Sequence, residues 1–255
     1  MTEPLFTGVG VALATLFDDA GEVDATATAG HAANLVELGI RAVVVAGSTG
    51  EAAALTSEER IELLTETRKA VPSGIPVVAG TGGPSARQAA ALTRDARESG
   101  ADAVLALCPP RTADPRPYYQ AVVEAAGELP ALAYHFPQTS PPGIPLDLLA
   151  ELPVQGVKDS SGDPDRLLAE LEVYDRWLYV GAAPLLIMAG ALGVTGAILA
   201  VANVDPERAA AAFAGDPAGQ RGLFAAHQRV QHNFPHGLKQ AIAARFSTSP
   251  TTRLG

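Results

Sequence analysis

The lysine at position 158 is the residue of this sequence with the clearest chemical potential. It follows residues 153–157 (PVQGV), a largely apolar run that indicates a short buried strand. An amine at the end of such a strand lies beside apolar walls, and removal from water favours its neutral, nucleophilic form. Lys158 is therefore a candidate nucleophile toward a carbonyl group. An ion pair with the neighbouring Asp159 is the alternative, purely structural interpretation.

Two other segments carry groups that could assist at a carbonyl carbon. Residues 47–51 (GSTGE) combine two hydroxyls, Ser48 and Thr49, with flexible glycines just before an expected helix. Hydroxyls and backbone N–H groups in such a turn can hold a carboxylate or a phosphate, although the GK[ST] ending of a P-loop is missing. Tyr134 follows the apolar residues 131–133 and could move protons as a general acid or base, or simply cap the core.

These groups need elements that bring them together, and a repeated pattern supplies such elements. Segments 37–47, 98–107 and 191–200 each contain a helical stretch, a glycine and an uninterrupted apolar run. Glycine closes a helix because it accepts the left-handed conformation. An apolar run without alternation is typical of a parallel strand buried on both faces. Alternating helices and buried strands predict a parallel sheet.

Completion of this pattern gives eight strands, near 9–14, 41–46, 76–79, 103–107, 131–134, 154–157, 178–180 and 195–200. We therefore expect a (β/α)8 TIM barrel over residues 1–215 with a short C-terminal helical extension over residues 216–255. An open doubly wound sheet is the alternative. Active sites of such barrels form at the carboxyl ends of the strands, where all the candidate residues above fall.

Composition and charge restrict the partners. The formal charge of −10 argues against nucleic acid and anionic membrane surfaces. Because Cys108 is the single cysteine, we expect no intrachain disulfide. The histidines show no metal-ligand spacing. The acidic N-terminus is unlike a secretory signal. The uncharged stretch 181–204 is long enough to cross a bilayer, but its glycines and Pro184 favour a buried helix and strand. We therefore expect a cytoplasmic protein without a membrane span.

The motifs together resemble the dihydrodipicolinate synthase / N-acetylneuraminate lyase family of pyruvate-dependent class I aldolases. The matching motifs are GSTGEAAALTSEER (47–60), GTGG (80–83), YHFP (134–137), GVKDSSGD (156–163) and GAILAVANV (196–204). They occur in the family's order, and the resemblance runs from about Phe6 to Gly255. It implies the same barrel fold.

The resemblance also implies roles for single residues. Lys158 matches the Schiff-base lysine, and Tyr134 matches the tyrosine that transfers protons. Ser48 and Thr49 match the hydroxyl pair that binds the keto acid's carboxylate, and Ser48 also matches a member of the proton relay. Ile198 matches the residue whose backbone lies against pyruvate. The implied partners are a small 2-keto acid and an aldehyde, with no metal or organic cofactor. The implied assembly is a homodimer or homotetramer.

The chain also departs from the synthases of this family. They carry a tyrosine pair after strand four, where this chain has Pro110-Arg111, and an arginine shortly after the catalytic tyrosine, where this chain has none. Arg111 is therefore a candidate substrate-binding residue, which replaces the missing tyrosine in the pocket or binds an acidic substrate from a neighbouring subunit; a solvated loop arginine is the alternative. The Ser48-Thr49 pair is more similar to the lyases, and the short interval from Tyr134 to Lys158 resembles the 2-keto-3-deoxy sugar acid aldolases.

We therefore predict a Schiff-base lyase or aldolase that makes or breaks a carbon–carbon bond between pyruvate, or a longer 2-keto acid, and an aldehyde. Three alternatives stay open: 4-hydroxy-tetrahydrodipicolinate (dihydrodipicolinate) synthase proper, a keto-sugar-acid dehydratase that uses the same iminium, and a non-catalytic keto-acid-binding regulator. In the synthases a tyrosine after strand four supplies the third hydroxyl of the proton relay. This chain has Pro110-Arg111 at that place, and the missing hydroxyl favours the regulator. Retention of Lys158 and Tyr134 favours turnover, because carboxylate binding alone requires neither.

Overall fold

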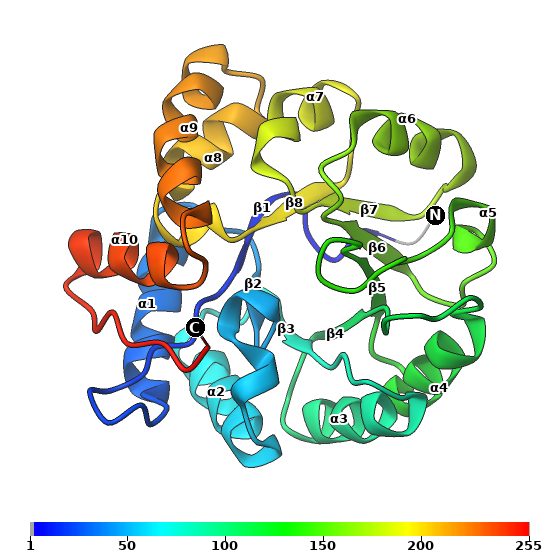
Figure 1. The fold of residues 1–255 in the computed structure, drawn as a ribbon, viewed down its shortest axis with the longest axis horizontal. Helices are drawn as coiled ribbons and strands as arrows, with labels where there is room; N and C mark the ends of the chain where they lie inside the picture. Colours follow the sequence, from blue (N-terminus) through cyan, green and yellow to red (C-terminus); the bar gives the residue numbers. More distant parts are fainter. Residues whose placement is uncertain (1–2, 255) are drawn as a thin grey trace.

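A computed structural model of the chain describes residues 3–254. Its parallel strands follow one another around a closed barrel, and β1 pairs with β8 to complete it (Figure 1). The strands are β1 (Gly8–Ala12), β2 (Val43–Val45), β3 (Val77–Gly80), β4 (Ala103–Leu107), β5 (Ala131–His135), β6 (Gly156–Asp159), β7 (Trp177–Val180) and β8 (Gly196–Leu199). This closure confirms the predicted barrel and excludes the open doubly wound sheet.

Helices surround the barrel (Figure 1). They are α1 (Ala25–Glu37), α2 (Ser57–Ala70), α3 (Ala86–Glu98), α4 (Arg116–Ala126), α5 (Leu146–Leu149), α6 (Pro164–Val173), α7 (Leu186–Ala191), α8 (Pro206–Phe213), α9 (Pro217–Gln231) and α10 (His236–Phe246). Short 3-10 turns lie in the loops: η1 (Ser48–Gly50), η2 (Ala52–Ala54), η3 (Ala183–Leu185) and η4 (Val201–Asn203). The predicted helical extension is present as α9 and α10, with α9 packed against α8. The division of the chain at residue 215 stays a prediction.

The glycines that separate helix from strand adopt the left-handed conformation that the repeated pattern requires. Gly39, Gly100 and Gly193 have φ of 101°, 88° and 74°. The strands that follow them, β2, β4 and β8, are buried almost throughout. Each strand has one face toward the barrel interior and the other toward the helices, which is why their sequences do not alternate.

The sixth strand differs from its predicted bounds. The sequence pattern places it at 154–157, whereas β6 runs Gly156–Asp159 and includes two charged residues. A strand tolerates these charges because successive side chains point to opposite faces. Lys158 points into the barrel, and Asp159 points toward the outer helices.

Two apolar layers stabilise the barrel. The outer layer fills the space between strands and helices, for example with Val11 of β1 and Leu223 of α9. The inner layer fills the barrel interior, where the rings of Phe6 and Tyr179 stack with 4.6 Å between their centres. The Tyr179 phenol donates a hydrogen bond to the Phe6 carbonyl (3.1 Å), so its buried hydroxyl has a partner. This ring pair fills the amino side of the interior.

The uncharged stretch 181–204 folds as expected into a helix and a strand, α7 and β8. Both are part of the barrel and its helical layer (Figure 1). Within residues 3–254, no helix combines the length and the apolar character that a membrane crossing requires.

Candidate active site

Lys158 and Tyr134 occupy paired positions on neighbouring strands. Their Cα atoms are register partners between β6 and β5, so both side chains point to the inner face of the sheet. Lys158 is 4% exposed, and its Nζ lies 4.2 Å from the centre of the Tyr134 ring. An amine and a phenol are thus held side by side at the carboxyl end of the barrel, where active sites of this fold form.

Asp159 does not pair with Lys158, so the ion pair that was the structural alternative for this lysine is not formed; the nearest cationic group to Asp159 is Arg166, with 3.5 Å between Nε and the carboxylate. The Asp159 carboxylate lies on the opposite face of β6 and accepts hydrogen bonds from the backbone N–H (2.6 Å) and the hydroxyl (3.0 Å) of Ser161. In the described part of the chain, the lysines that form ion pairs are Lys69 and Lys239. The Lys158 amine is therefore available to an electrophile.

A glycine after β7 makes room for the lysine side chain. A Cβ at Gly181 would overlap the Ser160 hydroxyl and would lie 3.0 Å from Cε of Lys158. A side chain at position 181 would therefore force Ser160 to move and would crowd Lys158 at the pocket. Sequence reasoning missed Gly181, although its place directly after the apolar run WLYV marked the end of a strand.

The loop that carries Ser48 and Thr49 is held by the barrel. Thr49 is buried and Ser48 is partly buried within the turn η1. The Thr15 hydroxyl donates a hydrogen bond to the Gly50 carbonyl (2.8 Å), which ties η1 to the end of β1. Among residues 3–254, no hydrogen-bond partner engages the Ser48 or Thr49 hydroxyl. Both hydroxyls are therefore free to bind a ligand carboxylate.

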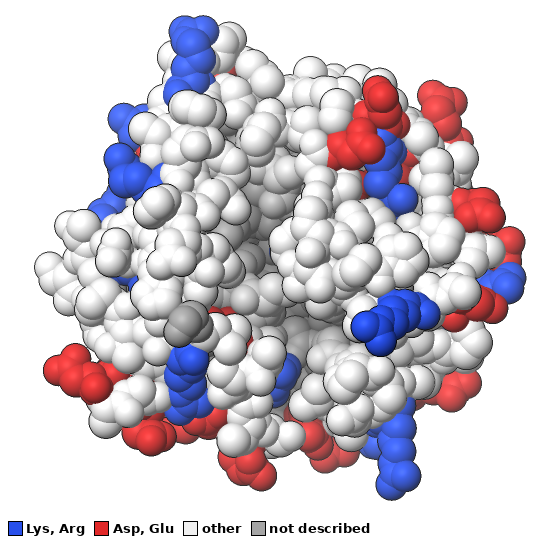
Figure 2. Space-filling model, in the orientation of Figure 1, with Lys and Arg blue, Asp and Glu red and all other residues white. Residues whose placement is uncertain are grey.

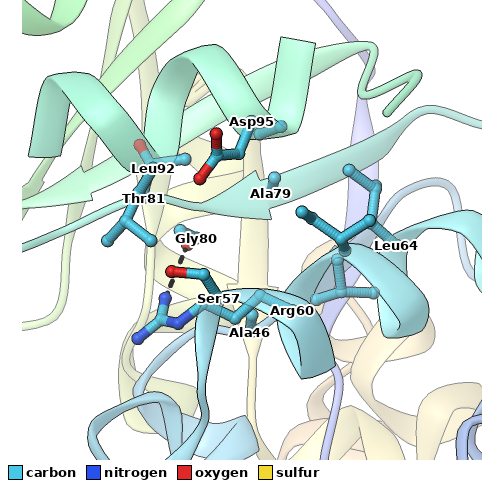
Figure 3. Close-up of a pocket in the computed structure, with 12 residues that line it drawn as sticks. Ala46, Ser57, Arg60, Leu64, Ala79, Gly80, Thr81, Leu92 and Asp95 are labelled. Carbon is cyan, nitrogen blue, oxygen red and sulfur yellow. Dashed lines mark hydrogen bonds between the residues drawn. The ribbon is translucent and has the colours of Figure 1, made fainter. Parts of the chain in front are cut away.

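Arg60 of α2 braces the same loop from outside the barrel. Its guanidinium donates to the Ala52 carbonyl in η2 and to the Gly80 carbonyl at the end of β3 (3.1 Å). Figure 3 shows the second bond within a small cavity of about 20 Å³, which has room for a single water. Gly80 allows β2 and β3 to approach, because a Cβ there would collide with the Ala46 carbonyl. The cavity lies beside the Arg60–Gly80 hydrogen bond and is too small for a metabolite.

The candidate residues share one pocket at the barrel mouth, with a volume of about 660 Å³. Its lining includes Lys158, Tyr134, Ser48, Thr49 and Ile198, the residues that sequence reasoning assigned to the keto acid. Figure 2 shows the hollow in this face of the molecule, with a mostly uncharged rim and with charged side chains toward the outer edge. The volume suits a small metabolite.

Arg111 is the predicted site residue that the structure does not bring to the pocket. It is exposed, has a φ of 61°, and is absent from the pocket lining within residues 3–254. Tyr118 and Tyr119 of α4 are buried, and their phenols donate to the carbonyls of Gly83 and Ala106. Neither tyrosine supplies the missing hydroxyl of the proton relay.

The outer wall of the pocket comes from the C-terminal part of the chain, which sequence reasoning did not assign to the site. Phe234 and Pro235 of the connection between α9 and α10 line it, and so does Leu254. In Figure 1 the segment after α10 runs back toward α2 and the barrel mouth. No motif marks these residues, because they reach the pocket through tertiary packing.

Ionisable side chains cluster behind β6, outside the barrel wall. Nε of Arg166 lies 3.5 Å from Asp159 and 2.9 Å from Glu170, and Glu170 is fully buried. Burial, aided by the Asp159 charge, raises the pKa of Glu170 to about 8. Burial and the nearby Arg166 lower the pKa of His135 to about 4. The neutral His135 accepts the Ile144 N–H at Nδ1 (2.8 Å), which gives this histidine a structural role.

Comparison with known sequences identifies the family. A model of the dihydrodipicolinate synthetase family matches residues 5–247. An uncharacterized DapA-like lyase of Halobacterium salinarum is 32% identical over 241 residues, which cover 91% of this chain and 79% of the relative. The 4-hydroxy-tetrahydrodipicolinate synthase of Pseudomonas aeruginosa is 34% identical over 233 residues, which cover 86% and 80%.

Solved structures agree with this result. Dihydrodipicolinate synthase DapA-2 of Bacillus anthracis has a TM-score of 0.87 at 27% identity, with 98% of this chain and 91% of that chain covered. The chloride-inhibited dihydrodipicolinate synthase of Acinetobacter baumannii, solved with pyruvate, has a TM-score of 0.86 at 27% identity, with 99% and 94% covered. The chain belongs to the dihydrodipicolinate synthetase family, which confirms the resemblance drawn from its motifs.

Proposed function

We propose that this protein is a Schiff-base lyase or aldolase that acts on pyruvate or on a longer 2-keto acid. Membership of the family supports a pyruvate-dependent lyase of the class I aldolase kind. The observation that carries the proposal is the buried Lys158 amine beside the Tyr134 ring, in a pocket that also contains the Ser48 and Thr49 hydroxyls.

The mechanism starts with the keto acid's carboxylate, which Ser48 and Thr49 bind so that C2 meets Lys158. The lysine nitrogen adds to C2, Tyr134 transfers the protons, and water leaves, so that an iminium forms. In cleavage, Tyr134 takes the proton of the C4 hydroxyl, the C3–C4 bond breaks, its electron pair passes to the iminium to give an enamine, and the aldehyde departs. The enamine then takes a proton at C3, and hydrolysis releases pyruvate and the free amine. In synthesis, the enamine attacks the aldehyde carbon instead; neither direction requires a metal or an organic cofactor.

The part of the pocket beyond the lysine indicates an uncharged second substrate. Gln138 and Gln231 offer amide groups, and Phe136 and Phe234 offer apolar surface. Among the described lining residues, Lys158 is the only lysine or arginine. A carboxylate on the aldehyde would therefore lose its hydration without gaining a cationic partner. We infer an aldehyde that carries hydroxyl or apolar groups.

Dihydrodipicolinate synthase activity is the second candidate, because several relatives carry that name. The pocket supports it less well. Arg111 lies outside the lining, and Gln138 stands in the segment after Tyr134 where the synthases place their arginine. A keto-sugar-acid dehydratase would use the same iminium and the same pocket.

The test is a panel of 2-keto acids with neutral and with carboxylated tails, followed by detection of pyruvate, aldehyde and dehydrated products. We expect pyruvate and an aldehyde from a neutral, hydroxylated 2-keto acid. Loss of water without cleavage would indicate the dehydratase. Binding of pyruvate without turnover of any panel member would contradict the proposed enzyme and favour the non-catalytic regulator.

The cytoplasmic location and the homodimeric or homotetrameric assembly stay predictions. Light scattering of the purified protein during gel filtration tests the assembly. We expect a mass of two or four chains, and a mass of one chain would contradict it.

A further inference from the structure

The segment that follows α10 belongs to the pocket. After Phe246 the chain turns at Ser247, whose φ is 57°, and returns to the barrel mouth beside α2 (Figure 1). Leu254 then lines the same pocket as Ser48 and Thr49. This return is held by two sets of polar contacts, one around Glu51 and one around Arg253.

Glu51 joins the returning segment to the carboxylate-binding loop. Its side chain is 1% exposed, and Oε2 accepts the backbone N–H groups of Arg253 (2.8 Å) and Leu254 (2.7 Å). Its other oxygen, Oε1, lies 3.2 Å from Nζ of the fully buried Lys239. That Nζ also donates to the Thr251 carbonyl (2.9 Å). The buried carboxylate thus forms an ion pair with one ammonium at Oε1 and accepts two backbone N–H groups of the C-terminal segment at Oε2.

Arg253 fixes the segment from its other side. The guanidinium donates to both carboxylate oxygens of Glu59 (2.7 and 2.9 Å) and to the carbonyls of Ala54 (3.0 Å) and Gly21 (2.6 Å). It also lies over the Phe17 ring, 4.8 Å from the ring centre. A bidentate arginine–carboxylate pair is among the stronger surface interactions because its geometry is rigid. The segment is therefore an ordered part of the molecule.

Glu51 also belongs to the turn that presents the two hydroxyls. It follows Gly50 directly, has a φ of 56°, and donates its backbone N–H to the Ser48 carbonyl (3.2 Å). A non-glycine residue in the left-handed conformation is uncommon and needs compensating contacts. Its side-chain contacts with the C-terminal segment are such contacts, and they add to the Thr15 and Arg60 hydrogen bonds that hold the same loop.

We propose that residues 251–254 are a positioning element of the active site, which acts through Glu51 to hold Ser48 and Thr49 where they bind the keto acid's carboxylate. The inference rests on the proposed function, because it assigns that carboxylate to these hydroxyls. Glu51 and Arg253 are positioning residues and take no part in the bond changes.

The test compares Glu51→Gln and Arg253→Ala with the unchanged protein by borohydride trapping over a range of pyruvate concentrations. Loss of a charge-assisted hydrogen bond corresponds to roughly ten- to hundredfold in affinity. We expect the half-saturating pyruvate concentration to rise about tenfold or more in both variants. Trapping at saturating pyruvate should stay within about threefold of the unchanged protein, since Lys158 and Tyr134 are intact. The matched control is Arg68→Ala, because Arg68 binds the carbonyls of Val71, Pro72 and Ile75 at the other end of the barrel.

An unchanged half-saturating concentration in both variants would overturn the inference, as would an equal rise in Arg68→Ala. If Glu51→Gln does not fold, Arg253→Ala decides alone. Amide hydrogen exchange of a peptide over residues 47–54, measured without pyruvate, gives a second readout: it should be faster in Arg253→Ala than in Arg68→Ala, and equal exchange would overturn the coupling. Absence of trapping in the unchanged protein would contradict the proposed function instead, and the exchange experiment would still decide whether the segment holds the loop.

Discussion

Gly181 lies against the side chain of Lys158, close enough that a Cβ on Gly181 would be 3.0 Å from Cε of the lysine. The same Cβ would overlap the Ser160 hydroxyl, so Gly181→Ala should displace both Ser160 and the Lys158 amine without altering the chemistry of the amine. A displacement of about 1 Å can cost roughly 10²-fold in rate, so we expect pyruvate-dependent trapping to slow by about ten- to hundredfold. Gly30→Ala is the control, because a Cβ at that exposed helical position meets no atom within 4 Å. Equal trapping rates in the two variants would show that the lysine does not need this space.

Tyr134 provides the second prediction. Tyr134→Phe keeps the ring beside Lys158 and removes the phenol, so pyruvate affinity should change little. General acid–base assistance is worth roughly 10²–10⁴-fold in rate, and kcat should fall by that amount. Steady-state kinetics with a cleavable 2-keto acid provides the measurement. An unchanged kcat would remove Tyr134 from the mechanism.

The sequence predicts the barrel because parallel strands buried on both faces appear as uninterrupted apolar runs, three of which follow a glycine that ends a helix. The end of β6 is the exception, since Lys158 and Asp159 continue the strand as charged residues. The keto-acid half of the pocket is also predictable, because the carboxyl ends of parallel strands meet at one edge. The outer wall of the pocket is not predictable from the sequence. Glu51 contacts Arg253 and Leu254 across about two hundred residues, and no local pattern encodes such a contact.

The cluster behind β6 predicts a pH dependence of stability. The pKa of Glu170 is raised from 4.5 to about 8 in the folded chain, so the folded state keeps a proton that the unfolded chain releases between these pH values. The free energy of unfolding should therefore decrease as pH rises toward 8, with a slope of at most about 1.4 kcal/mol per pH unit from this group. His135, whose pKa is lowered from 6.5 to about 4, acts in the opposite sense and only below about pH 6.5.

Urea unfolding at pH 6.5 and pH 8.5 measures this dependence. The unchanged protein should lose stability between the two pH values, and Glu170→Gln should lose clearly less. Parallel pH profiles of the two proteins would mean that Glu170 is ionised throughout, with Arg166 as a full ion-pair partner.

The scarcity of cationic side chains in the pocket predicts weak synthase activity, since Lys158 is the only lysine or arginine among the described lining residues. Aspartate semialdehyde carries a carboxylate, and the segment after Tyr134 offers Gln138, whose amide already donates to the Ser161 carbonyl (2.6 Å). We expect kcat/KM with pyruvate and aspartate semialdehyde well below about 10⁴ M⁻¹s⁻¹, the lower bound for efficient enzymes, and higher values with an uncharged aldehyde. A coupled synthase assay above that bound would contradict the prediction. In that case loss of activity in Arg111→Ala would assign the carboxylate to Arg111.

The most direct test of the Schiff-base mechanism is borohydride reduction in the presence of pyruvate, followed by peptide mapping. The chain has three lysines, and they provide their own controls. Lys69 is exposed and Lys239 is buried in an ion pair with Glu51, whereas Lys158 is buried beside Tyr134. We predict that the reduced adduct forms on Lys158 alone and that Lys158→Arg abolishes it, because a guanidinium stays protonated and does not attack a carbonyl. An unmodified Lys158 peptide, or equal modification of Lys69 and Lys239, would contradict the mechanism.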